Sequence, residues 1–367
     1  MTHQRIERAR ALLETSGVDA ILVTNGTNRR YLTGFTAADH AADELSGEVV
    51  ITHDGVYLFA PSTNLPWARS EAWDGVHLMP QERRWTDAVA ELIRDKNVRT
   101  LGFEDATTTV QVYNQLQESL GDHRAELTPV GPMVDALRAV KTDVELALLQ
   151  TALRMTDEAF IAAERRIQAG MTERQAAEIV REELRAAGSD GESFDTIVAS
   201  GPNAAKPHHA PSDRVIQESE PVIIDMGALH AGYAGDLTRT IWFGHASQQL
   251  VTIYQIVQSA FDACVAQAGP GMTGVELDAV ARDLFAEHDM DQYFVHSLGH
   301  GLGLRVHEAP SASARSTDTL EPGNVVTIEP GLYLPDWGGV RIEDVVVITE
   351  DGNRNLTGAP KRTMDHI

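Results

Sequence analysis

Residues 222–240 read VIIDMGALHAGYAGDLTRT, and this stretch decides the fold of the second half of the chain. Three apolar residues predict a buried strand that ends at the carboxylate of Asp225, and a second apolar strand follows Asp236. A short glycine-containing turn would let these strands pair and could bring both carboxylates to one point. Buried carboxylates repel each other, so a cation between them is the natural resolution.

The same pattern recurs nearer the C-terminus. Residues 327–331 read TIEPG and residues 341–344 read RIED, so Glu329 and Glu343 each follow or interrupt an apolar strand. A turn is predicted between them, at PDWGG. The sequence therefore predicts two hairpins that together supply four carboxylates.

Histidines accompany these carboxylates on glycine-rich segments. Residues 296–307, HSLGHGLGLRVH, contain His296, His300 and His307. A further pair, His208 and His209, ends the segment GPNAAKPHH. Glycines at such positions suit a site on which backbone segments converge closely.

Four carboxylates and one imidazole favour a metal of the Mn, Fe, Co or Zn type over a cysteine-rich structural zinc. Taken singly, each acid is compatible with a strand end or an ion pair, and each histidine with a satisfied core position. Five such side chains on apolar strands and glycine-rich turns instead predict a metal site. If two of them bridge, the set suits two ions roughly 3.5–4 Å apart.

The length of 367 residues suits two domains. The first third alternates strand and helix patterns, which predicts an α/β domain ending near residue 130. Its strands are expected at 20–24, 48–51, 56–60 and 100–103, with a turn at 53–55 and helices at 1–14, 86–96 and 107–120. The second half is predicted to be α+β, with a mainly antiparallel sheet. Its helices are expected at 143–167, after a capping box of Thr172 and Gln175, at 247–267 and at 274–287.

Composition narrows the partners and the compartment. The net charge of −24 argues against nucleic acid, whose phosphates would be repelled. No apolar run approaches the roughly 20 residues of a membrane span, so no membrane partner is expected. The N-terminal segment lacks the apolar core of a secretory signal, and the single cysteine, Cys264, is expected in the core; both favour a cytoplasmic location. The acidic surface is compatible with a salt-rich source or with an ordinary acidic protein.

The motifs over residues 223–240, 296–310, 327–333 and 338–344 together resemble the pita-bread metallopeptidase family. That family includes Xaa-Pro aminopeptidase, prolidase, methionine aminopeptidase and creatinase. FDTIVASGPNAAKPHH (194–209) and YLTGF (31–35) extend the resemblance over nearly the whole chain, in the Xaa-Pro peptidase branch. The resemblance implies a creatinase/prolidase-like α/β domain over 1–134. A catalytic pita-bread domain with a mainly antiparallel sheet would follow over 135–367.

The resemblance also implies a ligand set for two divalent ions per subunit, with Mn as the first candidate and Co, Fe or Zn as alternatives. Asp236 and Glu343 would bridge the ions. Asp225 would hold one ion, and His300 with Glu329 would hold the other.

Roles in catalysis are implied in the same way. A hydroxide between the ions would attack the peptide carbonyl, and Glu329 would pass protons toward the leaving nitrogen. His307 would stabilise the oxyanion, and His208 and His296 would contact the substrate. Arg341 is expected to contribute to substrate binding and to orient the glutamate ligand two residues after it.

The implied reaction is hydrolysis of the Xaa-Pro bond at the N-terminus of short proline-containing peptides, by a homodimeric enzyme. Many strict dipeptidases of the family carry an arginine four residues after the second histidine, where this chain has Ser311. Arg315 lies nearby and could substitute. The departure favours aminopeptidase action on longer peptides. A non-peptide C–N hydrolase or lyase on the same metal-bearing scaffold, and a binding protein without catalysis, remain as alternatives.

Overall fold

The computed structural model describes residues 2–37, 46–81, 83–123 and 125–362. The chain forms two compact units, residues 1–138 and residues 139–367. No helix in the described ranges is long and apolar enough to cross a membrane.

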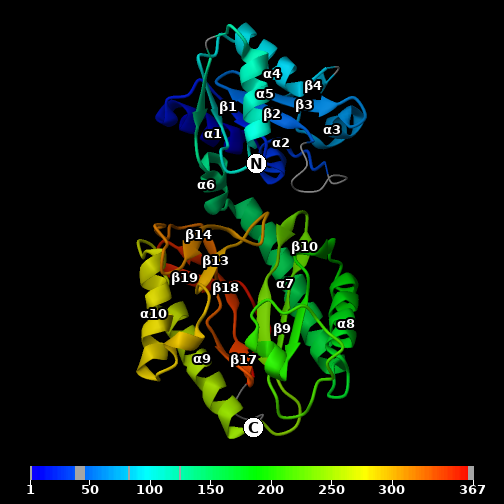
Figure 1. The fold of residues 1–367 in the computed structure, drawn as a ribbon, viewed down its shortest axis with the longest axis vertical. Helices are drawn as coiled ribbons and strands as arrows, with labels where there is room; N and C mark the ends of the chain where they lie inside the picture. The colour runs from blue at the N-terminus through cyan, green and yellow to red at the C-terminus, as the bar shows by residue number, and fades with distance from the viewer. Residues whose placement is uncertain (1, 38–45, 82, 124, 363–367) are drawn as a thin grey trace. The chain divides into compact units, whose positions relative to one another are not determined.

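The first unit is built on a six-stranded mixed sheet with the order β4-β3-β2-β1-β5-β6 (Figure 1). The pairs β1–β2 and β2–β3 are antiparallel, and the remaining pairs are parallel. The strands are β1 Ala20–Val23, β2 Glu48–Thr52, β3 Val56–Pro61, β4 Val76–Gln81, β5 Thr100–Phe103 and β6 Glu126–Pro129. The helices are α1 Thr2–Ser16, α2 Gly26–Thr33, α3 Leu65–Glu71, α4 Trp85–Asp95, α5 Val110–Leu120 and α6 Met133–Ala139.

The predicted α/β alternation of the first unit is confirmed, and the predicted elements agree with the observed ones to within three residues at each end. Helix α5 begins at Val110 rather than at Thr107, because the Thr109 side chain accepts a hydrogen bond from the Val112 amide and caps the helix. The edge strands β4 and β6 were not predicted. Both include a proline, which weakens a strand pattern but is tolerated at the edge of a sheet.

The second unit contains four long helices and a set of antiparallel strands. The helices are α7 Asp143–Arg166, α8 Glu173–Ala186, α9 Gln248–Gln267 and α10 Gly274–Glu287, with short 3-10 turns η1 Gly201–Ala205 and η2 Asp291–Tyr293. The strands are β7 Gly191–Glu192, β8 Ile197–Ser200, β9 Val222–Met226, β10 Ala228–His230, β11 Tyr233–Ala234, β12 Leu237–Ile241, β13 Gly299–Gly301, β14 Glu308–Ala312, β15 Val325–Ile328, β16 Gly331–Leu334, β17 Gly338–Arg341, β18 Asp344–Thr349 and β19 Gly352–Asn355.

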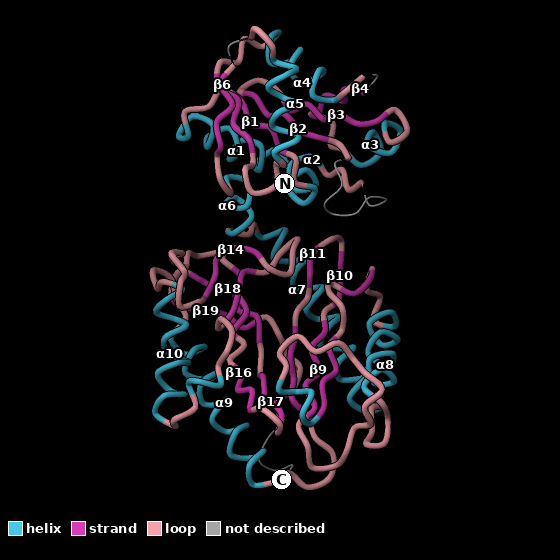
Figure 2. The backbone as a smooth tube through the Cα atoms, viewed as in Figure 1, coloured by secondary structure: helices cyan, strands magenta, loops and turns pink. Residues whose placement is uncertain are grey.

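Every strand pairing described in this unit is antiparallel, which confirms the predicted sheet type. The sheets run β12-β9-β8, β14-β13-β15-β18-β19, β11-β10-β7 and β16-β17. Figure 2 shows the strands between α9 and α10 on one side and α8 on the other. One apolar core joins α7 and α8 to β8, β9 and β12, and another joins α9 and α10 to β15, β16, β17 and β18.

The helix starts follow from local sequence. Capping boxes begin α7, α8 and α10, each with a threonine whose side chain accepts from the backbone three residues on. Thr172 and Gln175 form the box that the sequence predicts for α8. Cys264 is fully buried on α9, as expected of a small core residue.

Three of the four predicted carboxylates lie directly before or between strands, and the fourth lies near the end of a strand. Asp225 lies inside β9, opposite Thr238 of β12, and Asp236 directly precedes β12. Glu329 connects β15 to β16, and Glu343 lies between β17 and β18. The chain therefore turns from one sheet into another at both glutamates, which directs their side chains to a shared point.

Glu48 at the start of β2 is a buried acid outside this cluster, with only 2% of its surface exposed. Burial raises its pKa from 4.5 to about 7, although Gln81 donates a hydrogen bond to it. Because the folded pKa exceeds the unfolded one, stability falls as pH rises from about 4.5 to 7, by at most about 3 kcal/mol.

We expect Glu48→Gln to stabilise the protein more at pH 8 than at pH 5, because it removes the burial of a charge and keeps the oxygen that accepts from Gln81. Thermal unfolding of both proteins at the two pH values measures this difference. An equal change in melting temperature at both would contradict the assigned pKa.

Candidate functional site

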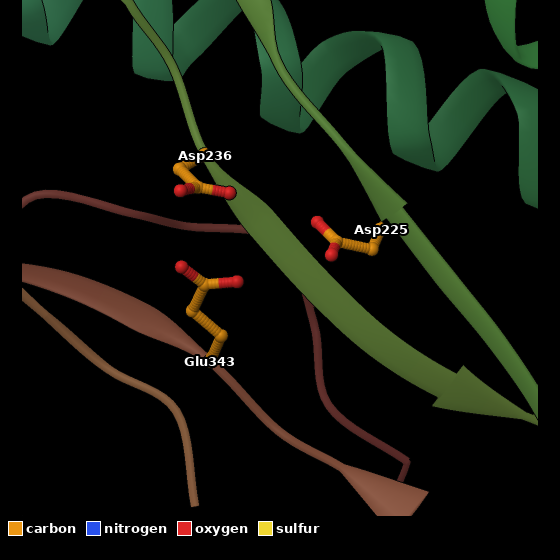
Figure 3. A group of neighbouring side chains, drawn as sticks. All are labelled: Asp225, Asp236 and Glu343. Atoms are coloured by element: carbon orange, nitrogen blue, oxygen red, sulfur yellow. The ribbon is translucent and has the colours of Figure 1, made fainter. Parts of the chain in front are cut away.

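Asp225, Asp236 and Glu343 form the centre of the candidate site. One carboxylate oxygen from each lies within 4.8 Å of the others. Figure 3 shows the two aspartates on neighbouring chain segments and Glu343 facing them from the opposite side. The register of β9 and β12 accounts for the first pair, because it brings residues 225 and 236 to the same end of the hairpin.

His300 and Glu329 adjoin this centre. His300 Nε2 lies 3.1 Å from Glu329 Oε1 and 3.8 Å from Asp236 Oδ2. Its other ring nitrogen, Nδ1, donates to the Gly301 carbonyl at 3.1 Å, so Nε2 is the nitrogen that faces the carboxylates. The structure thus brings together all five side chains that the sequence assigns to metal; their role as ligands stays a prediction.

Two glycines beside His300 allow its strand to pack closely against the neighbouring strands. Strand β13 lies between β14 and β15, and any side chain on its two glycines would strike a neighbouring backbone. A Cβ at Gly299 would collide with the Thr327 carbonyl, and one at Gly301 with the Ala309 carbonyl. Only glycine permits this close approach.

The three central carboxylates bind protons unusually tightly in the absence of a cation. Burial raises the pKa of Asp236 well above its ordinary range, and the neighbouring charge of Glu343 raises it further. Burial also raises the pKa of Glu343, as do the charges of Glu329 and Asp225. Asp225 Oδ1 and Glu343 Oε1 are buried without a hydrogen-bond partner among the described residues. Clustered carboxylates with free inward oxygens fit divalent cations.

His300 and Glu329 instead form an ion pair. Burial acts to raise the pKa of Glu329, but the hydrogen bond and charge of His300 outweigh it and lower the pKa to about 2. Burial acts to lower the pKa of His300, but Glu329 reverses this and raises the pKa to about 9. Both groups therefore have strong electrostatic partners, and a cation could take the place of the imidazolium proton between them.

Arg341 supplies the nearest fixed positive charge. It is almost fully buried, and its guanidinium donates to Asp225 Oδ2 at 2.7 Å, to Thr238 Oγ1 at 3.0 Å and to the Tyr333 hydroxyl at 2.7 Å. The hydrogen bonds of the Arg341 side chain thus go to Thr238 of β12 and Asp225 of β9, and the expected orientation of Glu343 by this arginine stays a prediction. Glu343 is held by Arg239, which donates to the Glu343 carbonyl.

The Tyr333 hydroxyl determines which ring nitrogen of His296 carries the proton. Because it accepts from Arg341, which has no acceptor atoms, its proton is free to bond His296 Nε2 at 2.8 Å. His296 Nδ1 then donates to the Ser297 carbonyl at 2.7 Å. Burial lowers the pKa of His296, so the neutral ring fits this arrangement. The sequence analysis did not single out Tyr333. In the sequence it is marked only by its hydroxyl group on an apolar strand, two residues after Pro330-Gly331.

The five ligand-type residues and Arg341 line a cavity of about 670 Å³, a size suited to a small ligand. His208, His296 and His307 all lie on its wall. The His307 ring lies 4.4 Å from that of His300, centre to centre, and burial together with the charge of His300 lowers its pKa. His209 also lines the cavity, but its Nε2 bonds to Glu173 at 2.9 Å.

The rest of the wall is mixed and includes Arg181, Asp195 and Thr196 beside apolar residues. Phe194, Ile197 and Val306 contribute to it, together with prolines from the His208 loop. Ser311 lines the cavity, and it pairs with His300 across β13 and β14. Arg315 is exposed and is absent from the wall, so it does not substitute there for an arginine at position 311.

Comparison with known proteins agrees with this geometry. The model of metallopeptidase family M24 matches residues 147–350, more than half of the chain. The chain belongs to this family. The model of the creatinase/prolidase N-terminal domain matches residues 5–140, ahead of the M24 region. The predicted family and fold class are thereby confirmed, and membership in a metallopeptidase family implies bound divalent metal.

Relatives of this M24 family member match it along almost its whole length. A Pyrococcus furiosus protein named Xaa-Pro dipeptidase is 35% identical over 354 residues, which cover 96% of this chain and 97% of the relative. The structure of a Bacillus anthracis Xaa-Pro dipeptidase is similar with a TM-score of 0.92, at 37% identity and 99% coverage of each chain. That of a Thermotoga maritima X-Pro aminopeptidase has a TM-score of 0.86, at 31% identity, covering 98% of this chain and 99% of that one.

We expect Arg341→Met to weaken Mn(II) binding roughly 10- to 100-fold, because it removes the group that orients Asp225. Isothermal titration of the metal-stripped protein measures the affinity. Arg174→Met is the control, since Arg174 is exposed and pairs only with Asp213 among the described acidic residues. Equal affinities for both variants would show that Arg341 does not support a metal ligand.

Proposed function

We propose that this M24 family member is a metal-dependent peptidase that hydrolyses the Xaa-Pro bond at the N-terminus of short peptides. The observation that carries the proposal is the cluster of five buried or half-buried ligand-type side chains, with two inward oxygens that lack partners among the described residues. The names of the relatives support the Xaa-Pro specificity. The ligands proposed are Asp225, Asp236, His300, Glu329 and Glu343.

Two divalent ions, with Mn as the first choice, would supply a nucleophilic water of lowered pKa and polarise the scissile carbonyl. We propose that Glu329 takes a proton from the attacking water and delivers it to the proline nitrogen as the carbon–nitrogen bond breaks. His307 donates to the oxyanion, and His208 contacts the substrate. Both ring nitrogens of His296 have hydrogen-bond partners. This residue therefore contributes its ring to the cavity wall, and Tyr333 fixes the orientation of that ring.

Proline directly after the scissile bond suits this cavity. The proline nitrogen carries no hydrogen, so it cannot form the strand-like bond that many peptidases use. Recognition must then come from the shape of the pyrrolidine ring. The apolar side chains of Phe194, Ile197 and Val306 offer such a surface beside the carboxylate cluster.

Peptide length is the finer question. The proposal is aminopeptidase action on peptides longer than two residues, because Ser311 lies on the cavity wall at the position where many strict dipeptidases of the family carry an arginine. The homodimer and the division into residues 1–134 and 135–367 are proposed on the family resemblance, and the cytoplasmic location on the single cysteine and the N-terminal composition.

Hydrolysis of Xaa-Pro dipeptides and Xaa-Pro-Yaa tripeptides tests the proposed function. We expect the metal-stripped protein to be inactive, Mn(II) or Co(II) to restore cleavage of both lengths, and tripeptides to have the higher kcat/KM. Asp236→Ala should abolish activity because it removes a proposed bridging ligand.

Cleavage of dipeptides alone would identify a strict dipeptidase. If a protein with two bound metal ions cleaves neither substrate, the peptidase proposal fails, and a non-peptide C–N hydrolase or lyase becomes the better account.

We expect Ser311→Arg to raise kcat/KM for dipeptides relative to tripeptides by roughly 10- to 100-fold, since a hydrogen bond to a charged group contributes about 1.5–3 kcal/mol. The ratio of the two kinetic constants is the measurement. Ser313→Arg is the matched control, because Ser313 bonds to Ser311 but is absent from the cavity wall. The same ratio in both variants would exclude position 311 as the determinant of length.

A further inference from the structure

Glu173 is a fully buried carboxylate at the start of α8, outside the metal cluster. Its oxygens accept hydrogen bonds from six donor groups on four residues. Ser200 donates through its amide and its hydroxyl, both at 2.8 Å, and Ser212 through its amide at 3.0 Å and its hydroxyl at 2.6 Å. Asn203 Nδ2 lies 3.1 Å away, and His209 Nε2 lies 2.9 Å away.

All of these donors belong to one segment, residues 200–212. This segment leads from the end of β8 through η1 to the loop that carries His208 into the cavity wall. Glu173 therefore bonds the segment near its beginning, at its middle and at its end. Its carboxylate thus supplies fixed contacts to a loop that forms no strand or α-helix over residues 206–212.

Other contacts reinforce this attachment. The Glu173 amide donates to the Arg214 carbonyl, and the Arg174 amide donates to the Ser212 carbonyl, so the first turn of α8 bonds the loop as well. Arg214 donates to the Ser200 hydroxyl at 2.6 Å, which directs that hydroxyl's own proton toward Glu173. A negative charge at this end of the helix is also favoured by the helix dipole.

The carboxylate remains charged in this setting. Burial acts to raise its pKa, but the hydrogen bonds from Ser212, Ser200 and His209 outweigh burial and lower the pKa to about 2. The glutamate is thus a permanent acceptor over the working pH range of an enzyme.

We propose that Glu173 is a positioning residue for the substrate site: by binding residues 200–212 at several points, it holds His208 against the cavity. His209, the second member of the histidine pair, serves as one of its anchors rather than as a substrate group. The inference rests on the proposed function, in which His208 contacts the peptide. It assigns roles to Glu173 and His209 that ligand-type spacing in the sequence does not indicate.

The first test is Glu173→Gln. The amide group would face N–H donors where an oxygen now accepts from them, so the segment should loosen. We expect kcat/KM for an Xaa-Pro-Yaa peptide to fall roughly 10- to 100-fold, as for a misplaced contact residue. Mn(II) affinity should stay unchanged, because none of the five proposed ligands lies on residues 200–212. The control is Glu276→Gln, a first-turn glutamate of α10 that bonds only Thr273 among the described residues.

A readout independent of activity separates this inference from the proposed function. We expect amide hydrogen exchange over residues 200–212 to be at least tenfold faster in Glu173→Gln and unchanged in Glu276→Gln. If the wild-type protein cleaves no Xaa-Pro peptide, the proposed function fails, whereas the exchange result still reports on the anchor. Unchanged exchange, or an equal loss of Mn(II) affinity and kcat/KM, would overturn the positioning role.

A second pair of variants tests His209 even if Glu173→Gln does not fold. His209→Gln keeps a side-chain donor for Glu173, and His209→Ala removes it. We expect the glutamine variant to retain most of the kcat/KM and the alanine variant to lose roughly tenfold of it. Equal losses in both variants would show that the imidazole itself acts on the substrate and would overturn the anchor assignment.

Discussion

Repulsion among buried carboxylates is the constraint on which the second unit depends. Two strand hairpins and the segments beside them bring Asp225, Asp236 and Glu343 to one point, where burial raises the pKa of each of them. Antiparallel pairing with short connections places such groups together with little loss of chain entropy. The surrounding cores of α7 and α8 and of α9 and α10 hold the hairpins in position, so the packing of the unit sustains an arrangement that its charges oppose.

Two arginines, Arg341 and Arg239, lie around these carboxylates. Arg341 holds Asp225 and, through Tyr333, determines which nitrogen of His296 carries the proton. Arg239 holds the backbone of Glu343 from behind and pairs with Asp344. The arginines thus bind the outer faces of the acidic residues and leave inner oxygens for a ligand. In an ordinary network of ion pairs the carboxylate oxygens are all paired. Here some oxygens face inward without such a partner among the described residues, as a metal site requires.

The parts of the fold that could be predicted are those with a strong local signal. Apolar runs ending in acids located Asp225 and Glu329, and capping boxes located the start of α8. The parts that could not be predicted depend on contacts between segments distant in sequence. Nothing near Arg341 indicates that it reaches Asp225, 116 residues away, and Glu173 looks like an ordinary first-turn glutamate until Ser200 and Ser212 fold onto it.

The glycines beside His300 have a consequence for how the histidine motif should be understood. Strand β13 passes so close to its neighbours that a single methyl group at Gly299 or Gly301 would meet backbone oxygen. Backbone cannot retreat as a flexible side chain can, so the strand itself would have to move. Much of what makes the motif recognisable is therefore steric rather than chemical. An alanine at either position would force β13, and the imidazole it carries, to shift relative to the carboxylates.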